Sequence, residues 1–204
     1  MSESAMKDLL DRRTFLRDAG ALTVSASLLA SGAAVTMAPD PLRGPRISAV
    51  LFDGRYSSGR EFAKALVREG AAAFDVGPDV AMVWYGSLRN HLASFGGSVA
   101  GLTTQSDFFV SRCFGRELGR SAKYEGAHDS RGCREIMHRL RGTEDVSEIG
   151  DALRRAEYNW SEALAFALVR AKAQKPLAQW RRSEARTLPI GDHPGFLTSW
   201  LLTS

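Results

Sequence analysis

Four short apolar runs of the sequence are each followed by residues that carry acid, hydroxyl, guanidinium or imidazole groups. The candidates for binding are Asp53, Arg55, Tyr56, Ser57 and Ser58 after the first run, Thr103, Thr104 and Ser106 after the third, and His128 and Asp129 after the fourth. Backbone N–H groups at a helix start, with an arginine beside them, suit a carboxylate or phosphate. We therefore predict a site for a small anionic ligand. Plain helix capping by Ser58 and Glu61 explains part of the same pattern.

Catalysis is the alternative function for these side chains. Ser106, His128 and Asp129 are the residue types of an acyl-transfer triad, and Asp53 could act as an acid or base. However, the sequence lacks the G-x-S-x-G motif of a nucleophile elbow, and an Asp next to a His rarely orients its ring. We predict a non-catalytic binding or accessory protein, with a small hydrolase or transferase using Ser106, His128 and Asp53 as the alternative.

Metal and cofactor signatures are missing from the sequence. Asp53 and Asp75 are a candidate pair of metal-binding carboxylates, but the sequence near them has no histidines to complete the site. The chain has no G-x-G-x-x-G after its first apolar run, no P-loop and no C-x-x-C. We therefore predict no metal and no cofactor.

The apolar runs alternate with helical patterns, and this alternation must position the candidate residues. The runs at 47–52, 71–74, 98–102 and 122–125 read as strands. The helices between and after them begin near Ser58, Asp79, Ser106 and Ser130 and stop at Gly70, Gly96, Gly119 and Gly142. Connections this short favour right-handed crossovers and parallel strands, whose carboxyl ends share one edge. We predict an α/β three-layer sandwich over 47–142, with a four-stranded, mostly parallel sheet (Rossmann-like or flavodoxin-like).

The remainder, 143–204, reads as a helical extension packed on the same domain. Its apolar residues recur at helical spacing and predict one long helix that ends at Pro176; they are Ile149, Leu153, Ala156, Trp160, Leu164 and Ala167. An arginine-rich polar stretch and a turn follow. The apolar tail 196–202 is predicted to pack as a last helical turn or strand.

The N-terminus is predicted to be a targeting signal rather than part of the folded domain. Two arginines, Arg12 and Arg13, precede Phe15 and Leu16, and a weakly apolar run from Ala19 to Ala38 follows. Residues 8–38 resemble a bacterial twin-arginine (Tat) export signal. The resemblance implies that 1–38 is a signal peptide, that 39–46 is a proline-rich linker, and that the Tat translocase carries the folded protein to the periplasm. An uncleaved signal would anchor it to the inner membrane. Because Tat substrates often carry redox cofactors or travel with a partner that does, an exported oxidoreductase is the implied partner.

Charge and cysteine content add two further predictions. The chain has 27 Lys and Arg against 23 Asp and Glu, and the excess is concentrated in 131–186, where 12 basic residues face 8 acids. We interpret this excess as a solvated helix face, or as a surface for an acidic partner or an anionic membrane. A nucleic-acid partner is not predicted, because the sequence lacks aromatic residues interleaved with the lysines and arginines of a binding groove. The two cysteines, Cys113 and Cys133, are either buried apolar residues or, in an oxidising periplasm, a disulfide that stabilises the fold by about 3 kcal/mol.

Overall fold

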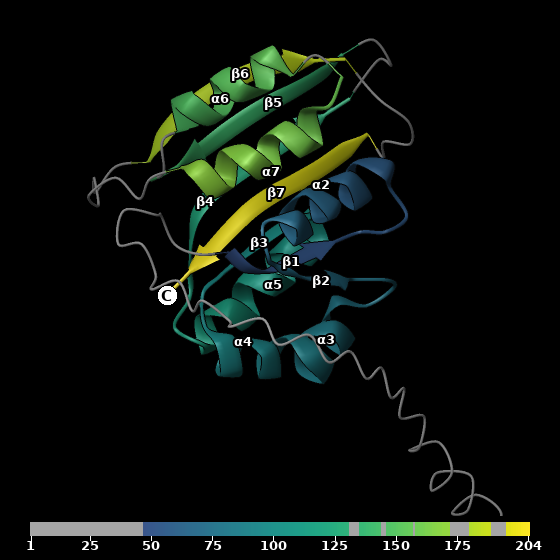
Figure 1. Ribbon diagram of the computed structural model, residues 1–204, viewed down its shortest axis with the longest axis vertical. Coiled ribbons are helices and arrows are strands. Elements are labelled where there is room, and N and C mark those ends of the chain that lie inside the picture. Colours follow the sequence, from purple (N-terminus) through teal and green to yellow (C-terminus); the bar gives the residue numbers. More distant parts are fainter. Residues whose placement is uncertain (1–46, 131–134, 144–145, 157, 172–179, 189–194) are drawn as a thin grey trace, which may run out of the picture. The chain divides into compact units, whose positions relative to one another are not determined.

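Seven strands form one mixed sheet in the order β2-β1-β3-β7-β4-β5-β6 (Figure 1). The computed structural model describes residues 47–130, 135–143, 146–156, 158–171, 180–188 and 195–204. The strands are β1 (Ile47–Phe52), β2 (Ala72–Asp75), β3 (Ser98–Thr103), β4 (Ser121–Asp129), β5 (Ile136–Gly142), β6 (Arg181–Thr187) and β7 (Phe196–Thr203). β1 is parallel to β2 and β3, whereas β7 is antiparallel to both β3 and β4. β4 therefore runs in the same direction as β1, β2 and β3.

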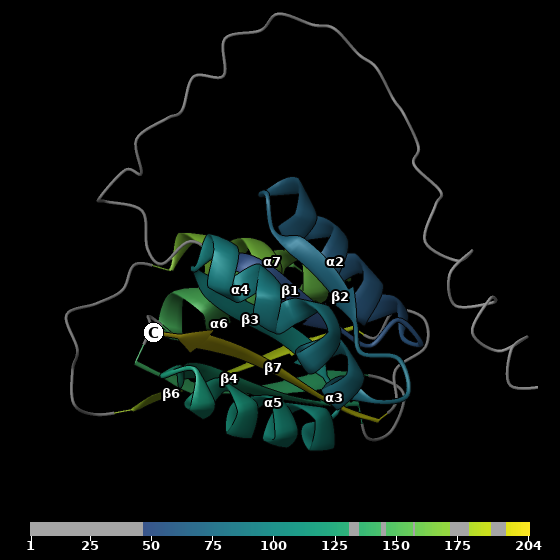
Figure 2. The same ribbon diagram turned by 90° about the horizontal axis from the view of Figure 1, so that it is seen from below.

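Helices cover both faces of the sheet (Figure 2). One face, called here the α7 face, carries α2 (Ser57–Arg68), α6 (Val146–Arg155) and α7 (Trp160–Arg170). The opposite face, called the α5 face, carries α3 (Val80–Val83), the π-helical turn η1 (Trp84–Leu88), α4 (Arg89–Phe95) and α5 (Gln105–Glu117). Apolar residues on both faces of β1 and β3 are buried, as expected for strands covered from both sides.

The α5 face is packed around Trp200 of β7. Its ring stacks on Phe108 of α5 with the centroids 5.8 Å apart, and its Nε1 donates to Thr103 Oγ1 at 3.2 Å. On the neighbouring strand, a Cβ placed on Gly101 would lie 2.1 Å from Trp200 Cε2. Only glycine allows the ring to lie this close to β3.

The predicted four-stranded, mostly parallel sheet followed by a long helix is wrong. The segment after Ser130, expected to be a helix, contains β5, and the polar arginine-rich stretch is β6. The predicted long helix is instead α6 and α7, interrupted around Asn159. The apolar tail is the strand β7, inserted between β3 and β4 in the middle of the sheet. β7 is buried along nearly its whole length, so its apolar run stabilises a central strand rather than an appendage.

None of the described helices is both long and apolar enough to cross a bilayer.

Candidate functional site

The sheet has a topological switch point between β1 and β3. These strands are neighbours and parallel, but the chain leaves β1 into α2 on the α7 face and leaves β3 into α5 on the other face. Ligands of open α/β sheets bind outside the carboxyl ends of strands at such a point. The residues that follow the two strands form what we call the strand-end site: Asp53, Arg55, Ser58, Thr104 and Asp107.

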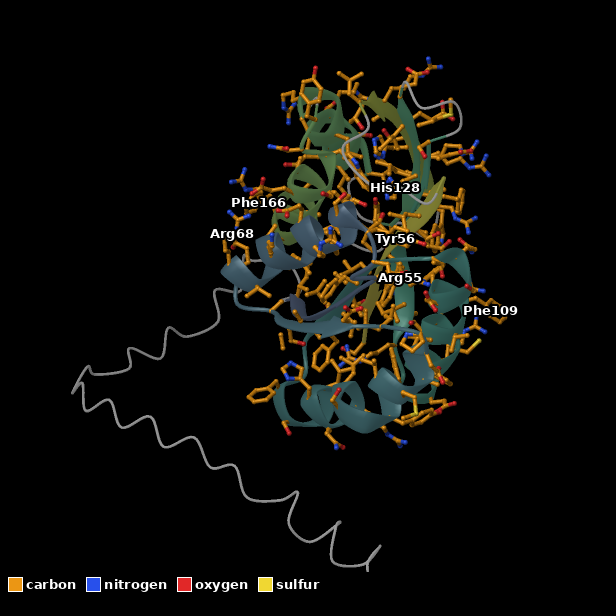
Figure 3. All side chains as sticks on the ribbon, turned by 90° about the vertical axis from the view of Figure 1, so that its right-hand side faces the viewer. Arg55, Tyr56, Arg68, Phe109, His128 and Phe166 are labelled. Carbon is orange, nitrogen blue, oxygen red and sulfur yellow. The ribbon has the colours of Figure 1, made fainter. Side chains whose placement is uncertain are left out.

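A buried carboxylate fixes an arginine at this site. Asp53 is fully buried, and its Oδ1 accepts the backbone N–H of Arg55 at 3.1 Å and the Nε of Arg55 at 2.9 Å, while Oδ2 accepts Nη2 at 2.6 Å. The hydrogen bonds and charge of Asp53 raise the pKa of the Arg55 guanidinium. The Arg55 side chain is nevertheless 60% exposed. Figure 3 shows Arg55 and Tyr56 next to one another at the middle of this edge. The result is a permanent cation held in one orientation and open to solvent.

The first turn of α2 lies beside Arg55 and departs from the predicted capping box. Tyr56 is the N-cap and makes no side-chain capping bond. Ser58, which was predicted to cap the helix, is instead its second residue. Arg60 N donates to Tyr56 O at 3.1 Å, the first bond of the helix. The N–H groups of Ser58 and Gly59 precede that bond and therefore have no acceptor within the helix.

The side-chain hydroxyl of Ser58 is also unusual. Its side chain is only 5% exposed, and among the described residues its Oγ finds no hydrogen-bond partner. Side chains of a helix lean toward its N-terminus, which directs this hydroxyl back toward the ends of β1 and β3. A buried hydroxyl without a partner costs about 1–3 kcal/mol. An acceptor bound at the helix start would remove that cost.

The start of α5 forms the opposite side of the site. Thr104 is the N-cap, accepting Asp107 N at 3.3 Å and donating its hydroxyl to Asp107 Oδ2 at 2.6 Å. The same hydroxyl lies 2.9 Å from Ser106 Oγ. The charge of Asp107 also contributes to the raised pKa of Arg55, so the two loops interact. Thr103 is buried and accepts Trp200 Nε1, which makes it part of the core.

His128, in contrast, belongs to a buried network on the α7 face. Its Nδ1 lies 2.6 Å from His138 Nδ1, its Nε2 lies 2.7 Å from Ser199 Oγ, and His138 Nε2 lies 2.8 Å from Thr187 Oγ1. Tyr124 contributes its hydroxyl, 3.1 Å from Ser199 Oγ. Both imidazoles are fully buried and pack on Trp160, with centroids 4.7 and 5.0 Å from its ring.

Hydrogen bonds can run through this network in one direction. If Tyr124 donates to Ser199 and Ser199 to His128 Nε2, then His128 Nδ1–H donates to His138 and His138 Nε2–H donates to Thr187. Every nitrogen and hydroxyl then has a partner, and the reverse direction satisfies them equally. Although Ser199 and His128 are in hydrogen-bond contact, both are fully buried. Their arrangement stabilises the core and offers no access to a substrate.

The residues of the alternative triad are not brought together. Ser106 contacts Thr104 at the start of α5, whereas the ring of His128 faces α7 on the other side of the sheet. Asp129 lies 3.6 Å from Arg139 of β5. Sequence reasoning missed His138, Ser199 and Thr187 because they become neighbours of His128 only through β5 and β6, which were not predicted, and through β7, whose central place in the sheet was not predicted. It did not single out Asp107 as a site residue.

The described residues include the predicted carboxylate pair and one of the two cysteines. Within these ranges no three His, Cys, Asp or Glu side chains are grouped closely enough to hold a metal ion. The carboxylate of Asp75, once considered beside Asp53, instead accepts the N–H groups of Gly54 and Gly77, each at 3.0 Å. Cys113 is exposed on α5, whereas Cys133 lies outside the described residues, so their disulfide stays a prediction. The Tat-like stretch also lies outside them.

Comparison of the chain with protein-family models, with curated proteins and with solved structures found no match.

Proposed function

We propose that the protein is a non-catalytic binding protein that holds a small anionic ligand, a carboxylate or a phosphate, at the strand-end site. The observation that carries the proposal is the position of the exposed Arg55 guanidinium beside the start of α2, where Tyr56 makes no side-chain cap, at a topological switch point. The ligand would accept hydrogen bonds from the N–H groups of Ser58 and Gly59 and from the buried Ser58 hydroxyl. The partial positive charge of the helix start favours the same anion.

The two carboxylates of the site limit the negative charge of the ligand that it can bind. Asp53 is neutralised by Arg55, and Asp107 is held by the Thr104 hydroxyl. Arg55 therefore offsets one of the two carboxylates, and the remaining negative charge of Asp107 opposes a second anion and favours a single ligand of low charge. A monoanion or dianion fits this balance better than a polyphosphate.

Calorimetric titration of the full chain with inorganic phosphate, acetate and succinate tests the proposal. We expect at least one anion to bind, and Arg55→Gln to weaken that binding about tenfold, since charge-assisted hydrogen bonds are the stronger kind. Arg68→Gln is the matched control, because Arg68 lies at the opposite end of α2 and pairs with Glu162. Failure of all three anions to bind, or equal losses in both variants, would refute the proposal.

We also propose that the Tat signal exports the folded protein to the periplasm, where an exported oxidoreductase is the candidate partner. The support is the sequence around Arg12 and Arg13. Replacing both with lysine should retain the protein in the cytoplasm on cell fractionation. Unchanged periplasmic recovery would count against export by this route.

A further inference from the structure

Among the described residues, the α5 face of the sheet is open over two strands, β5 and β6. α5 packs on β3, β7 and β4, but none of the described helices covers β5 or β6 from that side, since α6 packs on them from the other face. The uncovered residues alternate along β5 and β6 with buried ones. Side chains from α5, β4, β5 and β6 therefore share one solvent-exposed surface.

The half of this surface near the start of β4 is strongly basic. Arg112 and Arg116 are one turn apart on α5, Arg141 lies on β5, and Arg182 lies on β6 directly opposite Arg141. The acid among them is Glu125 of β4, whose side chain is only 9% exposed and which pairs with Arg141 and, at 3.6 Å, with Arg112. We call these five residues and Trp180 the basic stripe.

The other half of the surface is balanced. Arg139 pairs with Asp129 and Arg186 pairs with Glu135, while Glu184 lies between the arginines of β6. Positive charge is therefore concentrated at one end of the open face rather than spread over it. In the basic stripe, none of the described carboxylates lies within ion-pair distance of Arg116 or Arg182. Glu125 offsets the charge of Arg141, whereas Arg182 directly opposite is not offset by a described carboxylate, so an anionic partner would reduce the repulsion between the two arginines.

Exposed aromatic rings border the arginines. Trp180 is 44% exposed and lies against the Arg141 guanidinium, 5.5 Å from ring centroid to Cζ. Phe109 of α5 is 57% exposed and projects into solvent (Figure 3). Tryptophan and arginine are the residues most enriched where binding energy concentrates in protein interfaces.

We propose that the basic stripe is a docking surface for an acidic polypeptide segment of a partner protein. The arginines are borne on a rigid sheet and helix, and Glu125 orients two of them, which suits the bidentate recognition of carboxylate side chains. An extended acidic segment presents carboxylates about 7 Å apart on one face, a spacing that the long arginine side chains of neighbouring strands can reach. This surface lies at the opposite end of β4 from the strand-end site, so the proposal is independent of the proposed ligand.

Fluorescence anisotropy with the full chain tests this proposal. The probe is a labelled ten-residue peptide of alternating Glu and Thr, and its control is the same peptide with Gln in place of Glu. We expect the acidic peptide to bind at low salt, to bind at least fivefold more weakly at 0.3 M salt, and the Gln peptide not to bind, because the attraction is electrostatic and screened.

Two matched variants locate the binding. The double variant Arg116→Gln/Arg182→Gln removes the two arginine charges that lack a described carboxylate partner, and it leaves Glu125 paired with Arg112 and Arg141. We expect the double variant to bind the peptide about tenfold more weakly. Arg186→Gln removes one charge from the same strand in the balanced half and should change binding less than twofold. A double variant that binds as tightly as the wild type would overturn the proposal. So would vesicles of phosphatidylglycerol that bind through Arg116 and Arg182 while the acidic peptide does not bind.

Discussion

The Nδ1 atoms of His128 and His138 face one another at 2.6 Å across the β4–β5 pair, and they share a single hydrogen-bonding proton. The two rings link hydroxyl groups of three other strand residues, Tyr124, Ser199 and Thr187. A buried polar chain of this kind is stabilising only while each of its members has a partner. The network therefore fixes the register between β4, β5, β6 and β7.

Removing one hydroxyl should break this network. Ser199→Ala removes the hydroxyl that contacts both the Tyr124 hydroxyl and His128 Nε2, and we expect a loss of about 2–4 kcal/mol in the free energy of unfolding. Ser111→Ala is the matched control, because Ser111 is also fully buried but its Oγ has no described partner. That change should be neutral or stabilising. Urea denaturation measures both, and equal effects would contradict the role assigned to Ser199.

The contact between β3 and β7 should tolerate no side chain at residue 101. Gly101→Ala places a methyl group against the Trp200 ring, which is fully buried and stacks on Phe108. We expect a loss of at least about 3 kcal/mol, at the upper end of overpacking effects. Gly86→Ala in η1, where nothing lies within 4 Å of the added Cβ, should instead be neutral or stabilise by up to about 1 kcal/mol. Comparing the two denaturation midpoints tests the claim.

Alkaline pH should destabilise the protein through Tyr124. Burial raises the pKa of its hydroxyl, and the hydrogen bond to Ser199 offsets this only partly. The unfolded chain loses this proton above about pH 10 while the folded protein keeps it. The folded state then binds more protons, so stability is complete below pH 10 and falls as the pH rises above it, by up to about 1.4 kcal/mol per pH unit.

Tyr124→Phe should therefore flatten the alkaline part of the stability profile, although it lowers stability at pH 8. Tyr158→Phe, at an exposed position, should leave the slope unchanged. Urea denaturation between pH 8 and pH 11 measures the slopes, and parallel curves for the wild type and Tyr124→Phe would exclude this mechanism.

Ser58 offers a test that separates ligand binding from folding. Ser58→Ala removes a buried hydroxyl that has no described partner, so the melting temperature without ligand should stay the same or rise. The rise in melting temperature caused by a bound anion should become smaller in the variant, because a donor to the ligand is lost. A variant that melts lower without ligand would show that the hydroxyl already serves the fold.

The sequence indicated the first half of the sheet better than the second. The apolar runs at 47–52, 71–74, 98–102 and 122–125 are β1 to β4, because apolar residues on both faces leave little ambiguity. In β5 the inward residues are Ile136, His138 and Leu140, and a histidine at the middle position hides the alternation. In β6 they are small or polar, so the arginines dominate the pattern.

The candidate site, like the sheet, was predicted only in part. Asp53, Arg55 and Thr104 follow neighbouring parallel strands and do meet at one edge. His128 ends a strand of the same direction, yet its side chain points into the core, because the polar partners that accommodate it there come from distant segments. No local pattern identifies a partner such as Ser199, which lies 71 residues away along the chain.

The position of β7 has a kinetic implication. Residues 196–203 join β3 to β4, so strands β1 to β3 and strands β4 to β6 are held in one sheet only by a strand that follows all six of them in the chain. Until that strand has paired, β3 and β4 each expose an unpaired edge, and the partly folded chain is vulnerable to aggregation. The complete sheet forms only when this pairing between distant segments is made, which slows folding.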